Sequence, residues 1–153
     1  MKELQNLVFE KTSTTPRIEL FNTSGEISFT GRSLPENASR LYEPALNWVN
    51  DYILHPKPVT NLRLNMEYYN TSSMLWISKI IKSLSRINNP DYRLLVHIYI
   101  PLEEYDDMRG SADLRESFNP LTDILQHSIP EVSMKLYATD DASQVIRDAV
   151  VLF

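Results

Sequence analysis

The most constraining feature of this sequence is an unbroken alternation of side chains that passes directly into an amphipathic helix. Within residues 61–69 every second position is apolar, namely Leu62, Leu64, Met66 and Tyr68. This is the period of a β-strand with one buried face. Apolar residues then recur at helical spacing, at Ile77, Ile80, Ile81 and Leu84. The chain therefore predicts a sheet that amphipathic helices cover on one face.

The same two patterns recur along the rest of the chain. Strand periodicity marks residues 7–9, 16–21, 26–30, 93–100 and 133–137, with a hairpin turn at Asn22–Gly25. Helical spacing marks residues 38–53, the segment that begins at Asn119, and the C-terminal positions Val145, Ile146, Ala149 and Val150. We therefore expect a mixed α/β (α+β) fold, with a mixed sheet of about five or six strands and helices mainly on one face.

Length and composition limit the functions that the chain can have. Its 153 residues are the size of one domain, spanning 1–153. The net charge of −5 argues against a surface that binds nucleic acid. The longest apolar runs fall far short of the roughly 20 residues that cross a bilayer, and the N-terminus shows no secretory signal. We expect a cytoplasmic protein with neither a nucleic-acid nor a membrane partner.

The residue types that catalysis and metal binding need are scarce. Cysteine is absent, which removes thiol nucleophiles and thiolate metal sites. Three glycines are too few for a phosphate-binding loop. The three histidines lie in separate predicted elements, and His97 falls on the more polar side of its strand, which predicts an ordinary surface histidine. We therefore expect no catalytic residue, no metal site and no cofactor.

An acidic group between residues 103 and 107 allows three interpretations. Its members are Glu103, Glu104, Asp106 and Asp107. Carboxylates so close together could bind a divalent cation or act as a catalytic pair. They could also form an acidic contact surface for a basic partner. The ordinary interpretation is a solvated loop or short helix.

The junction between the alternating strand and the helix is rich in hydroxyl groups. Asn70, Thr71, Ser72 and Ser73 stand in a row. All are residue types that cap helix N-termini, and one cap would be enough. The additional hydroxyls are either polar filler or a phosphoacceptor. A phosphate at a helix N-terminus is stabilised by roughly 0.3–1 kcal/mol. The same phosphate would place about two negative charges against a docked partner.

Three segments around this junction resemble the SiaC family of bacterial regulatory phosphoproteins. They are Gly31–Asn37 (GRSLPEN), Tyr42–Pro44 (YEP) and Glu67–Ser73 (EYYNTSS). The resemblance covers about residues 14–118 and includes Asp106–Met108. Residues 119–153 are then a C-terminal extension, predicted as helix, strand and helix.

The resemblance implies a fold similar to STAS-type anti-sigma-factor antagonists and a function in signalling. Family members are phosphorylated on the threonine that corresponds to Thr71, with Ser72 and Ser73 as alternatives here. The modifying enzyme is a serine/threonine kinase of the anti-sigma-factor kinase type, and a PP2C-type phosphatase reverses it. The unphosphorylated protein, itself no enzyme, binds and activates a diguanylate cyclase, which raises cyclic di-GMP and favours biofilm.

Two other functions stay open on the residues alone. The chain could switch an anti-sigma-factor partner instead of a cyclase, with the same chemistry at Thr71. It could also be a small metal-binding enzyme that uses the carboxylates between Glu103 and Asp107. The identity of a co-purifying partner distinguishes an anti-sigma-factor switch from a cyclase activator. A calorimetric response to Mg²⁺ or Ca²⁺ tests the metal-binding enzyme.

Several neighbours of the junction are candidate partner-binding residues. Arg32 could hold a phosphate or a carboxylate with two hydrogen bonds, and Glu36 and Asn37 follow it in the same segment. Trp76 lies off the apolar stripe of the helix, where an indole either covers the edge of the core or anchors an interface. Tyr69 precedes the junction on the more polar side of its strand.

Overall fold

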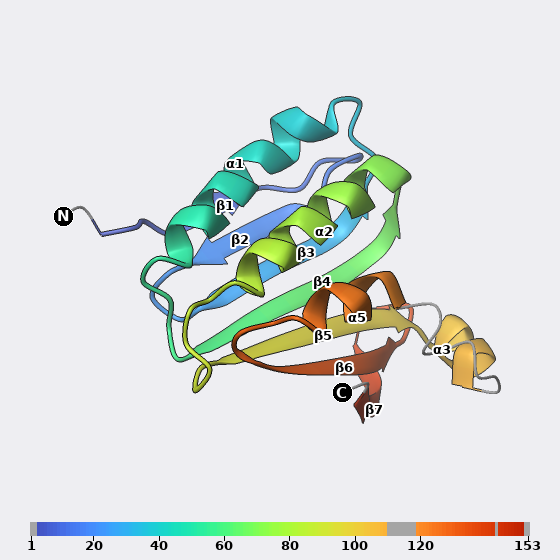
Figure 1. Ribbon diagram of the computed structural model, residues 1–153. Helices are drawn as coiled ribbons and strands as arrows, with labels where there is room; N and C mark the ends of the chain where they lie inside the picture. Colours follow the sequence, from blue (N-terminus) through green and yellow to red (C-terminus); the bar gives the residue numbers. More distant parts are fainter. Residues whose placement is uncertain (1–2, 110–118, 143, 152–153) are drawn as a thin grey trace.

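A single seven-stranded sheet organises the computed structural model, which describes residues 3–109, 119–142 and 144–151 (Figure 1). The strands lie in chain order: β1 (Leu7–Phe9), β2 (Arg17–Phe21), β3 (Glu26–Ser33), β4 (Val59–Tyr69), β5 (Arg93–Pro101), β6 (Glu131–Thr139) and β7 (Val145–Val151). The central strands β3 to β6 are parallel, and the outer pairs β1–β2, β2–β3 and β6–β7 are antiparallel. The mixed α/β class is as predicted, but the sheet is larger than the expected five or six strands.

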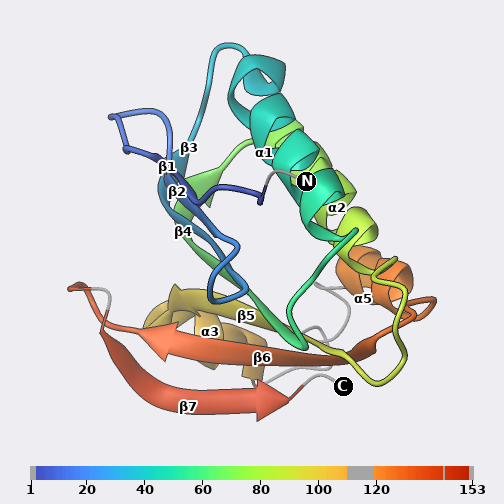
Figure 2. The same ribbon diagram turned by 90° about the vertical axis from the view of Figure 1, so that its left-hand side faces the viewer.

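Helices cover one face of this sheet. The helix α1 (Ala38–Tyr52) connects β3 to β4, and α2 (Thr71–Leu84) connects β4 to β5. The short helix α5 (Asn119–Leu125) precedes β6, and Figure 2 shows it on the same face as α1 and α2. Parallel crossovers share one hand, so a strand order that increases steadily puts every crossover helix on the same side. The helix α3 (Leu102–Arg109) follows β5 at the end of the sheet.

The core forms between the helices and the inner face of the sheet, as the periodicity predicts. Leu62, Leu64 and Met66 of β4 are buried, and so is the stripe of α2 at Ile77, Ile80, Ile81 and Leu84. Each such side chain contributes about 1.5–3 kcal/mol when it leaves water. Tyr68 continues the alternation in sequence but is 54% exposed.

The C-terminal segment corrects the prediction of a helix. Residues 145–151 form β7, which pairs antiparallel with β6. In the connection between them, Asp140 Oδ1 accepts the backbone N–H groups of Ala142 and Gln144, each at 2.9 Å. The β-branched residues Val145 and Ile146 suit a strand, and the free edge of β6 offers hydrogen bonds that outweigh the weak helical spacing. The described part of the extension is therefore helix, strand and strand.

Candidate switch site at the start of helix α2

Asn70 is the residue that caps α2. Its backbone is extended, and its side-chain oxygen accepts the backbone N–H of Ser73 at 2.9 Å. The same oxygen lies 2.6 Å from the Ser73 hydroxyl and 3.1 Å from the Ser72 hydroxyl. Asn70 also donates its backbone N–H to the carbonyl oxygen of Ser33 at 3.0 Å, which joins the junction to β3. Asn70 thus satisfies one orphan donor of the first helical turn, the backbone N–H of Ser73.

The hydroxyl of Ser73 belongs to the interior of the protein. Its side chain is fully buried, and its oxygen lies 2.7 Å from the hydroxyl of Ser33. Ser33 in turn lies 2.5 Å from the phenol oxygen of Tyr42 on α1. Burial raises the pKa of Tyr42, and the hydrogen bonds from the two serines oppose that rise. This buried cluster ties β3, α1 and α2 together, so Ser73 is a structural residue that a kinase cannot reach without local opening.

Thr71 is the exposed hydroxyl of the junction. It is the first residue of α2, and its side-chain oxygen makes no hydrogen bond within the described parts of the chain. Ser72 is half-buried and donates to Asn70. Among the three hydroxyls that the sequence proposes, Thr71 alone is exposed and has no structural task in the described residues. Its position also places a modification beside the N–H groups of the first helical turn, where negative charge is tolerated.

Exposed apolar side chains surround Thr71. Tyr68 is 54% exposed, Tyr69 is 44% exposed and Leu75 is 60% exposed. Leu75 lies one helical turn after Thr71, on the same side of α2. The sequence patterns do not single out Leu75, although its position off the buried stripe of α2 is a usable signal. Burial raises the pKa of Tyr69, and the negative charge of Glu104 on α3 adds to that rise.

The segment Gly31–Asn37 lies beside the junction. Arg32 is exposed and stands opposite Tyr68 in the pairing of β3 with β4. Glu36 is exposed as well. Asn37 caps α1, since its side-chain oxygen accepts the backbone N–H of Arg40 at 3.3 Å. Asn37 therefore has a structural role, whereas Arg32 and Glu36 remain candidates for contact with a partner.

Trp76 is half-buried at the edge of the core on α2. The ammonium nitrogen of Lys79 lies 4.4 Å from the centre of the indole ring, as in a cation–π contact. Both alternatives for Trp76 therefore stay open, because it covers the core and also borders the exposed face of the helix.

A cleft opens next to the junction, where β4 and β5 separate. Their pairing ends at Leu64 and Ile98, but both strands continue further. The cleft between them has a volume of about 640 Å³, and its lining includes Met66, Met74, Ile100 and Leu121, with Tyr69 and Glu104 near its edge. The carboxyl ends of adjacent parallel strands are a common place for binding sites in α/β folds.

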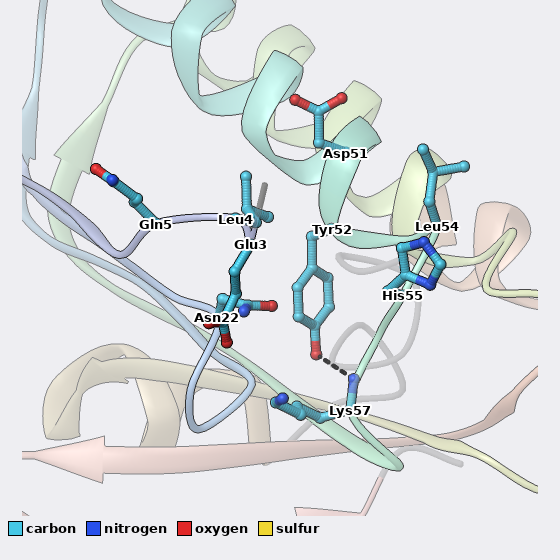
Figure 3. Close-up of a pocket in the computed structure, with 9 residues that line it drawn as sticks. All are labelled: Glu3, Leu4, Gln5, Asn22, Asp51, Tyr52, Leu54, His55 and Lys57. Atoms are coloured by element: carbon cyan, nitrogen blue, oxygen red, sulfur yellow. Dashed lines mark hydrogen bonds between the residues drawn. The ribbon is translucent and has the colours of Figure 1, made fainter. Parts of the chain in front are cut away.

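A second hollow lies at the opposite end of α1 (Figure 3). It has a volume of about 710 Å³ and is open to solvent between the N-terminal segment and the end of the helix. Tyr52 forms one wall, and its phenol oxygen accepts the backbone N–H of Lys57 at 3.1 Å and lies 2.8 Å from the hydroxyl of Thr60. These bonds connect elements of the fold, and the hollow lies away from Thr71.

His97 corrects another prediction. It is only 6% exposed, although the alternation along β5 places it on the sheet face opposite the core residues Val96 and Ile98. Its Nδ1 lies 2.8 Å from the phenol oxygen of Tyr137, and its Nε2 lies 2.9 Å from the side-chain oxygen of Asn61. Burial lowers the pKa of His97 to about 4, and the positive charge of Arg63 adds to this effect. Long side chains of the neighbouring strands cover the ring, which an alternation pattern cannot reveal.

The acidic group is partly helical. Glu103, Glu104 and Asp106 lie on α3, and all three are exposed. The side chain of Asp107 and residues 110–118 lie outside the described part of the chain. Among the side chains that are described, no group of three or more His, Asp or Glu residues is placed to hold a metal ion.

The fold and the capped, hydroxyl-rich strand–helix junction define a mixed α/β domain with an accessible threonine at a helix start. Residues 9–126 match the SiaC family, described as SiaC family regulatory phosphoprotein, and the chain belongs to this family. The family predicted from the three segments is therefore confirmed, over a slightly different range.

The chain is also similar to individual proteins of Pseudomonas aeruginosa. An uncharacterized protein of Pseudomonas aeruginosa strain UCBPP-PA14 is 30% identical over 81 residues, which are 53% of this chain and 64% of that relative. The crystal structure of apo-SiaC from Pseudomonas aeruginosa is 23% identical, with a TM-score of 0.63 over 85% of this chain and 98% of that one. A chain in the crystal structure of diguanylate cyclase SiaD with its activator SiaC, from the same species, is 21% identical. Its TM-score is 0.66 over 86% of this chain and 99% of that one.

At these identities the two structures show the same fold. In addition, no helix in residues 3–109, 119–142 and 144–151 has both the length and the apolar character needed to cross a membrane.

Proposed function

We propose that this protein is a phosphorylation-switched activator of a diguanylate cyclase. In its unphosphorylated form it binds and activates the cyclase, and phosphorylation of Thr71 releases it. A serine/threonine kinase of the anti-sigma-factor kinase type adds the phosphoryl group, and a PP2C-type phosphatase removes it. The protein acts by binding rather than catalysis, in the cytoplasm, and its output is a change in cyclic di-GMP that favours biofilm.

The observation that carries the proposal is the division of roles at the start of α2. Asn70 caps the helix, Ser73 is buried in a hydrogen-bonded cluster, and Thr71 is exposed without a hydrogen bond in the described residues. An exposed hydroxyl that makes no hydrogen bond in the described residues can be modified without a change in the fold. Membership of a family of regulatory phosphoproteins supports this interpretation. A structural relative is described as the activator of a diguanylate cyclase, which supports the choice of partner.

The energetics favour a change in binding without unfolding. A phosphate at Thr71 would gain roughly 0.3–1 kcal/mol from the helix terminus. A partner that covers Tyr68, Tyr69 and Leu75 would have to desolvate about two added negative charges. Unfavourable charge placement at an interface costs several kcal/mol, and each 1.4 kcal/mol is about tenfold in affinity. The folded state is therefore retained while the complex is lost.

The first experiment is peptide mapping of the protein recovered from its native host under two growth conditions. The proposal expects one phosphoryl group on Thr71, in proportions that differ between the conditions. If the peptide that spans Asn70 to Lys79 is unmodified under both, the switch is not at this site.

The second experiment measures cyclase activation by purified variants. Thr71→Glu should abolish binding and activation, whereas Thr71→Ala should retain both. The matched control is Ser72→Ala, which removes a neighbouring hydroxyl and should still be switched by phosphorylation. Equal activity of the Glu and Ala variants would contradict the switch. A co-purifying anti-sigma factor in place of a cyclase would keep the switch and replace the partner.

A further inference from the structure

The exposed face of α2 carries a line of positive charge that begins beside Thr71. Lys79, Lys82 and Arg86 are all exposed, and their spacing of three and four residues places them along one side of the helix and the turn that follows it. The same side carries the exposed Leu75 about one turn before Lys79 and Thr71 about two turns before it. We call this surface the α2 stripe: Thr71, Leu75, Lys79, Lys82 and Arg86.

The charge of the stripe is unusual for this protein. The whole chain has a net charge of −5, but no acidic residue occurs between Glu67 and Asp91. In the described residues the three cations of the stripe make no ion pair, whereas Arg17, Arg63 and Arg93 each pair with a glutamate. The stripe is therefore a local positive surface that no ion pair within the described part of the chain neutralises.

The stripe also contains apolar contact area. Leu75 is 60% exposed, and Trp76 lies half-buried next to it under the ammonium group of Lys79. Trp and Arg are residue types enriched in interface hot spots.

We propose that the α2 stripe is the docking surface for an acidic, amphipathic segment of the partner. This inference rests on the proposed function and specifies the chemistry of the partner surface. Apolar side chains of the segment would pack on Leu75 and Trp76, while its carboxylates would face Lys79, Lys82 and Arg86. Complementary charge of this kind raises the association rate and selects the partner.

The position of Thr71 at one end of the stripe explains how a phosphate would act on such a partner. Three positive charges attract an acidic segment, and a phosphate adds about two negative charges at the same surface. The net charge that the partner meets falls from about +3 to about +1, and the nearest carboxylates are repelled. The cations lie two or more turns away from Thr71, too far along the helix to pair with the phosphate and neutralise it.

The test uses the full-length protein and synthetic fluorescent peptides. One peptide carries leucines on one helical face and glutamates on the other, and its counterpart has lysine in place of every glutamate. The emission of Trp76 reports docking independently, since Trp48, the other tryptophan, is buried. Wild-type protein should bind the acidic peptide and not the basic one, and added salt should weaken binding because it screens exposed charges.

Charge reversal at the stripe should remove this binding. Lys79→Glu combined with Lys82→Glu should lower the affinity for the acidic peptide by at least about tenfold, as expected for several unfavourable charge contacts. The matched control is Lys11→Glu, an equal change in charge per residue on the exposed loop between β1 and β2, and it should stay within about twofold of wild type. Thermal unfolding verifies that the variants are folded. If the double glutamate variant is not folded, Lys79→Gln combined with Lys82→Gln replaces it, and a smaller loss of affinity for the acidic peptide is expected.

Cyclase binding then separates this inference from the proposed function. If the stripe variant binds the acidic peptide and the cyclase as wild type does, the stripe is not the docking surface, while Thr71 can still be the switch. If the stripe variant loses both ligands but protein phosphorylated on Thr71 binds the cyclase normally, the stripe is the docking surface and Thr71 is not the switch. Equal binding of the acidic and basic peptides would also overturn the inference.

Discussion

The sharpest test of the junction compares the loss of the cap with the loss of the free hydroxyl. In Asn70→Ala, the backbone N–H of Ser73 and the hydroxyls of Ser72 and Ser73 lose a common acceptor. Removal of an Asn cap costs about 0.5–2 kcal/mol. The lost hydroxyl contacts add to this cost, although Ser73 keeps Ser33 as a partner. We expect a total of about 2 kcal/mol.

Thr71→Ala should behave differently, because its hydroxyl makes no hydrogen bond in the described residues. We expect a change in the free energy of unfolding within about 0.5 kcal/mol, as for an ordinary surface position. For a domain of this size, the loss in Asn70→Ala corresponds to a fall in Tm of about 4–8 °C. The control is Asn70→Asp, which keeps an acceptor at the cap and should stay close to wild type.

Urea unfolding followed by circular dichroism measures all three variants, and calorimetry supplies Tm. Equal destabilisation by Thr71→Ala and Asn70→Ala would refute the reasoning. Thr71 would then share the capping role, and its hydroxyl would not be free for modification.

Three further predictions concern the stability of the fold that carries this site. As pH falls from about 6.5 to about 4, the unfolded chain gains a proton at His97 while the folded protein does not, so stability should fall by up to about 3 kcal/mol. Urea titrations of wild type and His97→Gln over this range should show a flatter pH dependence in the variant. Tyr42→Phe should cost about 1 kcal/mol in urea unfolding, because it removes one member of the buried hydroxyl cluster. Gly25→Ala should lower Tm and cost more than about 1 kcal/mol, since φ is +72° and an added Cβ would lie 2.6 Å from the carbonyl oxygen of Val59.

Periodicity was sufficient to predict the elements that form the core. The helical stripe of α2 gave the correct buried residues, and so did the alternation in β4 except at Tyr68, because each pattern depends mainly on the geometry of one element. The same reasoning failed for Val145 and Ile146, where the pattern is short and the choice between helix and strand is made by the free edge of β6. Local spacing contains no information about an edge that another part of the chain provides.

Local sequence patterns likewise indicated the position of the candidate site but not the contacts within it. The hydroxyl-rich junction indicated where a helix begins, and the resemblance pointed to Thr71. Sequence could not decide which of the four residues caps the helix, because that depends on the contact of Ser73 with Ser33 of another strand. It also could not show that His97 is buried, because its cover comes from β4 and β6.

The geometry of the junction also limits how a switch there can work. Three of its residues are committed to hydrogen bonds: Asn70 as the cap, Ser72 to Asn70, and Ser73 in a cluster that connects β3, α1 and α2. A phosphate on Thr71 would leave all of these bonds intact and would be weakly favoured by the helix terminus. The protein therefore has no local reason to change conformation on phosphorylation. Its response must be expressed at the surface, in the charge that a partner meets on the face of α2.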